Sequence, residues 1–137
     1  MNQIPGTTAD PASALASHVA LLLCADQEVH DLVDSWLTNA GATVISISSA
    51  EDAEKQILNR HAALLVLDTL PIYLPGLPSL RKLKRETPGL RVMLIPPVGE
   101  PCDVGLARIS GVDAILSRPT SRAILLSAVA GLCDSSS

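Results

Sequence analysis

The chain has 137 residues, the size of one domain, and 47 % of them are hydrophobic, which is enough for a packed core. Aromatic residues make up only 1 %, so the core must be aliphatic, and single-stranded nucleic acid would lack the stacking platforms it needs. The net charge of −4 argues against non-specific binding to DNA or to an anionic membrane.

The cysteines and the longest apolar run limit the environment of the chain. Cys24, Cys102 and Cys133 form no CxxC pair, so we expect neither a zinc site nor a disulfide framework, which favours a reducing, cytoplasmic setting. Residues 19–25 are far too few to span a bilayer, which takes about 20 apolar residues. The N-terminal residues lack the basic and apolar stretches of a signal peptide.

The two ends of the chain differ in composition from the middle. Residues 1–16 are rich in Pro, Gly, Thr and Ala without an apolar period, which predicts a flexible tail or linker. Residues 134–137 predict a disordered end. A single folded domain is therefore predicted over residues 17–133.

Apolar or β-branched runs alternate with segments of helical periodicity along this domain. The predicted strands are 19–24, 43–48, 62–68, 91–96 and 113–117. The predicted helices are 28–41, 49–61, 78–87, 102–111 and 120–132, with Ser49 and Thr120 as N-caps and Pro78 in a first turn. This alternation predicts a three-layer, doubly wound (βα)5 domain with a five-stranded parallel sheet, flavodoxin-like in class.

Sites in such folds lie at the carboxyl ends of the strands. The candidate residues there are Cys24, Ala25, Asp26, Asp68, Pro96 and Arg118.

The order of the elements and several motifs resemble the CheY-like receiver domain of bacterial response regulators. In "LLVLDTLP", Asp68 stands where the family has its phospho-accepting aspartate, and Gly76 matches the glycine that opens the third helix. In "GVDAILSRP", Arg118 occupies the lysine position. The resemblance covers roughly residues 18–133 and implies a signalling module of a two-component or phosphorelay system, not an enzyme.

The resemblance also implies a set of roles that this chain fills poorly. In the family, two acids and the aspartate hold Mg²⁺, a Ser or Thr binds the phosphoryl oxygen, and a Lys offsets its charge. The acid pair falls on Cys24 and Ala25, the hydroxyl position on Pro96 and the aromatic switch position on Ile115. Arg118 keeps the charge with a different geometry.

Asp26 follows the acid-pair positions, and short acids favour helix N-caps. We expect Asp26 to cap a helix starting near Gln27 rather than to bind a metal, and Cys24 to be a small buried hydrophobe. A magnesium site would depend on Asp26 and Asp68 alone and should be weak or absent, so we expect no cofactor unless Asp68 is phosphorylated.

Three functions stay open. The first is a degenerate receiver, or pseudo-receiver, that acts by protein–protein interaction with little or no Mg-dependent phosphorylation. The second is a working receiver that accepts a phosphoryl group on Asp68 from a histidine kinase. The third is a nucleotide or small-molecule binding module on the same fold, although the turn after the first strand has no glycine for a phosphate cradle.

The resemblance implies protein partners: a histidine kinase, a phosphotransfer domain, an output domain or a second copy of the chain. The family docks through its first helix, or through its fourth helix, fifth strand and fifth helix, which here would present Arg108, Asp113, Ile115, Arg122 and Leu125. The basic run over residues 81–85 is expected to be a solvated helix face.

Overall fold

The structure, a computed structural model, describes residues 18–74, 76–77, 79–97, 103–118 and 120–134. The predicted tail over residues 1–16 lies outside the described residues, as do Pro78 and Cys102.

Five strands alternate with five α-helices, as the sequence predicts. The strands are β1 (Val19–Leu23), β2 (Thr43–Ser46), β3 (Leu64–Leu67), β4 (Arg91–Leu94) and β5 (Ala114–Ile115). The helices are α1 (Gln27–Asn39), α2 (Ala50–Arg60), α3 (Leu80–Glu86), α4 (Val104–Ile109) and α5 (Arg122–Asp134), with a 3₁₀ turn, η3 (Pro71–Tyr73), before α3.

All neighbouring strands are parallel, and their order in the sheet is β2-β1-β3-β4-β5. The predicted fold class, a doubly wound α/β domain, is confirmed. Leu23 at the end of β1 pairs in register with Leu67 at the end of β3. This register brings the residues that follow the two strands, Cys24 and Asp68, to the same edge of the sheet.

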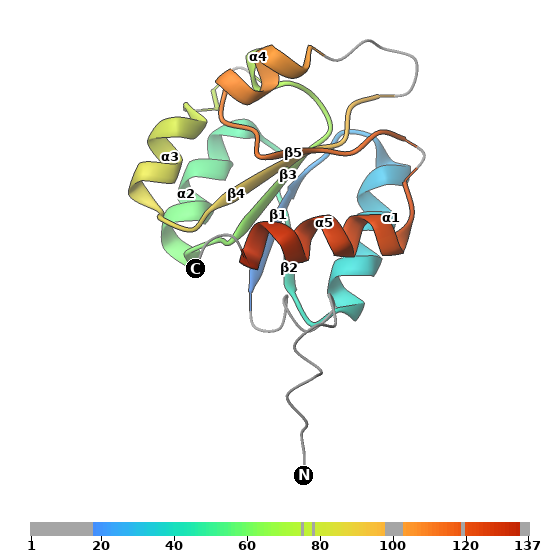
Figure 1. Cartoon of the computed structure of the whole chain (residues 1–137). Helices are drawn as coiled ribbons and strands as arrows, with labels where there is room; N and C mark the ends of the chain where they lie inside the picture. The colour runs from blue at the N-terminus through green and yellow to red at the C-terminus, as the bar shows by residue number, and fades with distance from the viewer. Residues whose placement is uncertain (1–17, 75, 78, 98–102, 119, 135–137) are drawn as a thin grey trace.

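Helices α1 and α5 cover one face of the sheet, and α2, α3 and α4 cover the other (Figure 1). The central strand β3 serves both layers, with Leu64 and Val66 in the α1/α5 core and Leu65 and Leu67 in the opposite core. All four side chains are buried, which explains why β3 reads as a continuous apolar run without polar alternation.

Some helix ends differ from the prediction. Ser49 caps α2, as expected, because its hydroxyl accepts a hydrogen bond from the Asp52 backbone N. Thr120 does not cap α5: the Ser121 hydroxyl accepts the hydrogen bond from Ile124 N at 3.2 Å, one residue further on. Gly76 lies in the turn before α3, which begins only at Leu80.

The basic run on α3 is not simply a solvated face, which corrects the prediction. The Lys84 ammonium donates to Asp113 Oδ1 at 2.6 Å and to the Gly111 carbonyl at 3.2 Å. The other carboxylate oxygen of Asp113 accepts the Val92 backbone N–H at 2.8 Å. Asp113 therefore joins α3 to β4 and β5, and its carboxylate is already occupied by internal partners.

No helix among the described residues is both long enough and apolar enough to cross a membrane.

Candidate functional site

Asp68 follows β3 directly and is one of the few buried charged residues, with 5 % of its surface exposed. Its Oδ2 atom accepts a hydrogen bond from the backbone N–H of Asp26 at 2.7 Å. The chain leaving β1 therefore closes over the carboxylate of Asp68. This contact ties the candidate phospho-acceptor to the first turn of α1.

Asp26 is the N-cap of α1, as the sequence predicts. Its Oδ1 atom accepts hydrogen bonds from the backbone N–H groups of Glu28 at 3.0 Å and Val29 at 3.3 Å. Its Oδ2 atom accepts one from Arg118 Nη1 at 2.7 Å. The hydrogen bond from Arg118, assisted by those from the helix N–H groups, lowers the pKa of Asp26 below its ordinary value.

Arg118 reaches the site from the segment after β5, and only 10 % of its side chain is exposed. Its second terminal nitrogen donates to the Ile95 carbonyl at 3.2 Å. The guanidinium thus neutralises the helix-capping carboxylate of Asp26. The sequence places both residues at the carboxyl edge of the sheet, but it did not predict that they pair. Two opposite charges at one sheet edge were the signal that could have indicated the pair.

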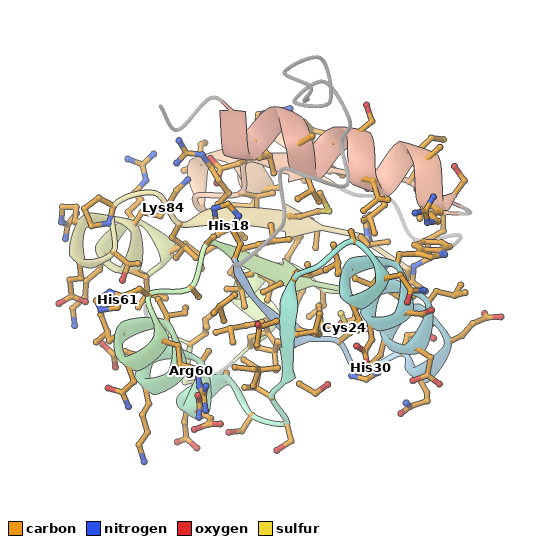
Figure 2. All side chains as sticks on the ribbon, turned by 90° about the horizontal axis from the view of Figure 1, so that it is seen from below. His18, Cys24, His30, Arg60, His61 and Lys84 are labelled. Carbon is orange, nitrogen blue, oxygen red and sulfur yellow. The ribbon has the colours of Figure 1, made fainter. Side chains whose placement is uncertain are left out.

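Cys24 follows β1 and lies near the start of α1 in Figure 2. Its sulfur is 3.7 Å from the Val66 carbonyl oxygen, to which the thiol donates. Burial, together with the nearby charge of Asp68, raises the pKa of the Cys24 thiol to about 12. Cys24 is therefore a neutral thiol near neutral pH and a poor nucleophile there. It is half-buried against the α1/α5 core, so the prediction of a buried residue is met only in part.

The donor atoms at this edge do not fit magnesium, which requires hard oxygen ligands in near-octahedral order. Cys24 and Ala25 supply no oxygen from their side chains, and both Asp26 oxygens already have partners. Pro96 offers neither a hydroxyl nor an N–H. Across the described part of the chain, no three His, Cys, Asp or Glu side chains converge to hold a metal ion.

Asp68 and Arg118 line different hollows. Asp68 lines a small hollow of about 240 Å³, together with Cys24, Ala25 and Thr69. Arg118 lines a larger pocket of about 480 Å³ beside α1. Asp26, which lines the larger pocket, is hydrogen-bonded to both residues and so links the two hollows.

The residues expected on a docking face differ in how exposed they are. Arg108 and Arg122 are exposed, and Ile115 is half-buried against the α2/α3/α4 core. Leu125 is fully buried, which corrects its assignment to a docking face: it lies on the side of α5 that packs on the sheet. The large exposed hydrophobic residues of α4 and α5 are instead Val104, Ile109 and Ile124.

The three histidines, His18, His30 and His61, lie well apart in Figure 2, so they form no catalytic cluster.

No family model matches the chain, and no curated protein matches it. Among solved structures, NtrX from Brucella abortus has a TM-score of 0.72 and 24 % identity, over 88 % of this chain and 27 % of NtrX. A CheY-like response regulator receiver domain protein from Methanospirillum hungatei JF-1 has a TM-score of 0.71 and 19 % identity, over 88 % and 97 % of the two chains. A two-component response regulator from Clostridium difficile has a TM-score of 0.68 and 19 % identity, over 86 % and 97 %. These similarities show that the fold is that of receiver domains.

Proposed function

We propose that this chain is a degenerate receiver domain: a protein-binding module of two-component or phosphorelay signalling that does not use Mg-dependent phosphorylation of Asp68. The observation that carries the proposal is the ion pair between Arg118 and Asp26. The cation expected to offset phosphoryl charge is bound to the acid that caps α1, at an edge that lacks the metal-binding acid pair.

The chemistry of phosphoryl transfer supports this proposal. Phosphorylation would convert the Asp68 carboxylate, whose residue is 5 % exposed, into an acyl phosphate, and so replace one negative charge by about two. Positioned positive charge must offset that increase. Arg118, the cation expected at this edge, is bound to Asp26 and would have to leave that carboxylate to neutralise a phosphoryl group.

The exposed surface of α4 and α5 suits a protein partner. Ile109 and Ile124 are 67 % and 55 % exposed, and Arg108 and Arg122 are exposed on the same two helices. Each of these two helices, which cover opposite faces of the sheet, therefore presents an exposed isoleucine and an exposed arginine, and such residues suit a partner with apolar and acidic side chains. We propose that a histidine kinase, phosphotransfer domain, output domain or second copy of the chain docks there, in the cytoplasm and without a cofactor.

The test is incubation with acetyl phosphate and Mg²⁺, followed by a phosphate-affinity gel and intact-mass measurement. A receiver that phosphorylates readily is treated in parallel as a positive control. We expect no phosphoryl adduct on the wild type, the same result as for Asp68→Asn. A hydroxylamine-sensitive adduct on the wild type that is absent from Asp68→Asn would overturn the proposal.

A receiver that still accepts a phosphoryl group is the second candidate, favoured by the position of Asp68 in a hollow of about 240 Å³ next to Thr69. A histidine kinase could align its phosphohistidine with this carboxylate where acetyl phosphate cannot. Transfer of labelled phosphate from a kinase to the wild type and not to Asp68→Asn would establish this candidate, and its absence across a panel of kinases would favour the degenerate receiver.

A further inference from the structure

The pocket of about 480 Å³ has apolar walls formed largely by α1. Its volume lies within the range of about 300–1,000 Å³ that is usual for small-molecule sites. The apolar lining is Val29, Leu32, Val33, Trp36, Ile95 and Pro97. Leu32 is 45 % exposed at the rim, and Trp36 is the only tryptophan of the chain.

Two polar atoms that belong to residues lining this pocket lack hydrogen-bond partners. Among the described residues, Arg118 Nε and Thr120 Oγ1 are buried and have no hydrogen-bond partner. The Arg118 side chain is nine-tenths buried, and both residues line the pocket. Buried donors without an acceptor are uncommon and unfavourable, so they indicate a partner that the protein itself does not supply.

The charges around the pocket determine the class of ligand. The positive charge of Arg118 is already paired with Asp26, and the exposed carboxylate of Glu28 also lines the pocket. An anionic ligand would therefore meet excess negative charge, and the described lining residues include no glycine that could cradle a phosphate group. An uncharged hydrogen-bond acceptor satisfies the Nε–H and the hydroxyl without that repulsion.

We propose that this pocket binds an uncharged, largely apolar small molecule whose carbonyl oxygen, from a ketone, ester or amide, accepts hydrogen bonds from Arg118 Nε and Thr120 Oγ1. The apolar body of the ligand lies against Leu32, Val33 and Trp36. This binding activity stands independently of the proposed signalling role, because the pocket does not include Asp68.

The probe for the test is 6-propionyl-2-(dimethylamino)naphthalene, an uncharged naphthyl ketone whose emission shifts to the blue in apolar sites. Binding is followed by that shift and by quenching of Trp36, which lines the pocket. We expect saturable binding to the wild type. A comparison ligand carries the same ring system with the ketone replaced by a methylene, and 1-anilinonaphthalene-8-sulfonate serves as an anionic comparison.

Two variants test the two ends of the pocket. Leu32→Asp places a charge at the exposed rim and should weaken ketone binding by about tenfold or more. Thr120→Val removes the hydroxyl while keeping the shape, and should weaken binding of the ketone by roughly threefold to tenfold but leave binding of the methylene analogue unchanged. Ile109→Asp makes the same kind of change as Leu32→Asp on α4, away from the pocket, and should have no effect.

Thermal unfolding confirms that each variant is folded before titration. Three results would overturn the inference: no saturable signal with the wild type up to the solubility limit of the ketone, equal binding to Leu32→Asp and the wild type, or binding of the methylene analogue or the sulfonate at least as tight as that of the ketone. Tighter binding of the ketone that is lost in Leu32→Asp and reduced in Thr120→Val would establish it.

Discussion

Asp26 uses one carboxylate oxygen to cap α1 and the other to bind Arg118. Asparagine caps a helix about as well as aspartate but carries no charge, so Asp26→Asn removes the ion pair and keeps the cap. We expect Asp26→Asn to lower the urea midpoint at pH 7, because it leaves a nine-tenths buried guanidinium without its counter-charge. Asp26→Ala should lower the midpoint further, since it removes the cap as well.

The pH dependence of this difference follows from the lowered pKa of Asp26. The contribution of the charged carboxylate is complete above the ordinary pKa of 3.8 and is lost as the pH falls through the lower pKa of the folded state. The gap in urea midpoint between the wild type and Asp26→Asn should therefore shrink in acid. A gap that stays constant down to the acid limit of folding would contradict the role of the ion pair.

The ionisation of Cys24 should change the free energy of unfolding only at alkaline pH. Its thiol has a pKa of about 12 when folded and about 9 when unfolded, so the unfolded chain loses the proton first. The free energy of unfolding should fall by about 1 kcal/mol between pH 8 and pH 10 through this residue alone. Urea unfolding of the wild type and of Cys24→Ala at both pH values measures this, because other groups contribute equally to the two proteins.

At the scale of elements, Lys84 holds α3 against β4 and β5 through Asp113 and the Gly111 carbonyl. We expect Lys84→Met to cost about 1–2 kcal/mol, because it leaves the partly buried Asp113 carboxylate without its cation. Lys82→Met is the matched control, since Lys82 is 50 % exposed and 3.6 Å from Glu54, and should change stability by less than about 0.5 kcal/mol. If urea unfolding shows that Lys84→Met and Lys82→Met lower the free energy of unfolding equally, the Lys84–Asp113 pair contributes no more than an exposed ion pair.

The turn between α4 and β5 depends on Gly111. Its φ is +110°, and a Cβ atom there would lie 2.8 Å from the Cβ of the buried Leu80. Gly111→Ala should destabilise the fold by about 2–4 kcal/mol, which combines backbone strain with overpacking. Gly89 has a similar φ of +95° and open space around it, so Gly89→Ala should show the strain alone, about 1–2 kcal/mol. Thermal unfolding of the two variants separates the contributions.

Many of these elements can be predicted from the sequence, because buried parallel strands are continuous apolar runs and helices show a periodic face. Asp26 and Ser49 were recognisable as caps from residue type and position. The prediction named Thr120 as the N-cap of α5 instead of Ser121. Both hydroxyls can cap a helix, and the sequence pattern does not resolve a shift of one residue. Leu125 was assigned to a docking face by resemblance to the receiver family. The resemblance does not specify which side of α5 packs on the sheet, and Leu125 lies on that buried side.

At the scale of the whole molecule, one sheet supports two aliphatic cores. Leu64→Ala and Leu65→Ala delete neighbouring side chains on opposite faces of β3, and each should cost about 2–5 kcal/mol. Trp36 packs on the core that holds Leu64, so its fluorescence reports that core directly. We expect both variants to shift the fluorescence and circular dichroism transitions together, as for a single cooperative unit. Separate transitions in Leu65→Ala would show that the cores unfold independently.

The candidate site was predicted less completely than the fold. The strand order places Cys24, Asp26, Asp68 and Arg118 at one edge, which the alternation of elements already implied. Which of them bond depends on where each strand ends in space and how far each side chain reaches. Residue spacing carries no information on either, so the Asp26–Arg118 pair and the pocket beside it emerged only from the structure.

The pair also bears on the order in which the molecule is built during synthesis. Arg118 enters the chain 92 residues after Asp26, so the ribosome has made all five strands before the guanidinium exists. Until then, the Asp26 carboxylate at the start of α1 has no cation to pair with. Completion of this edge therefore follows the synthesis of β5, and the sheet face beside α1 is fully covered only when α5 has been made as well.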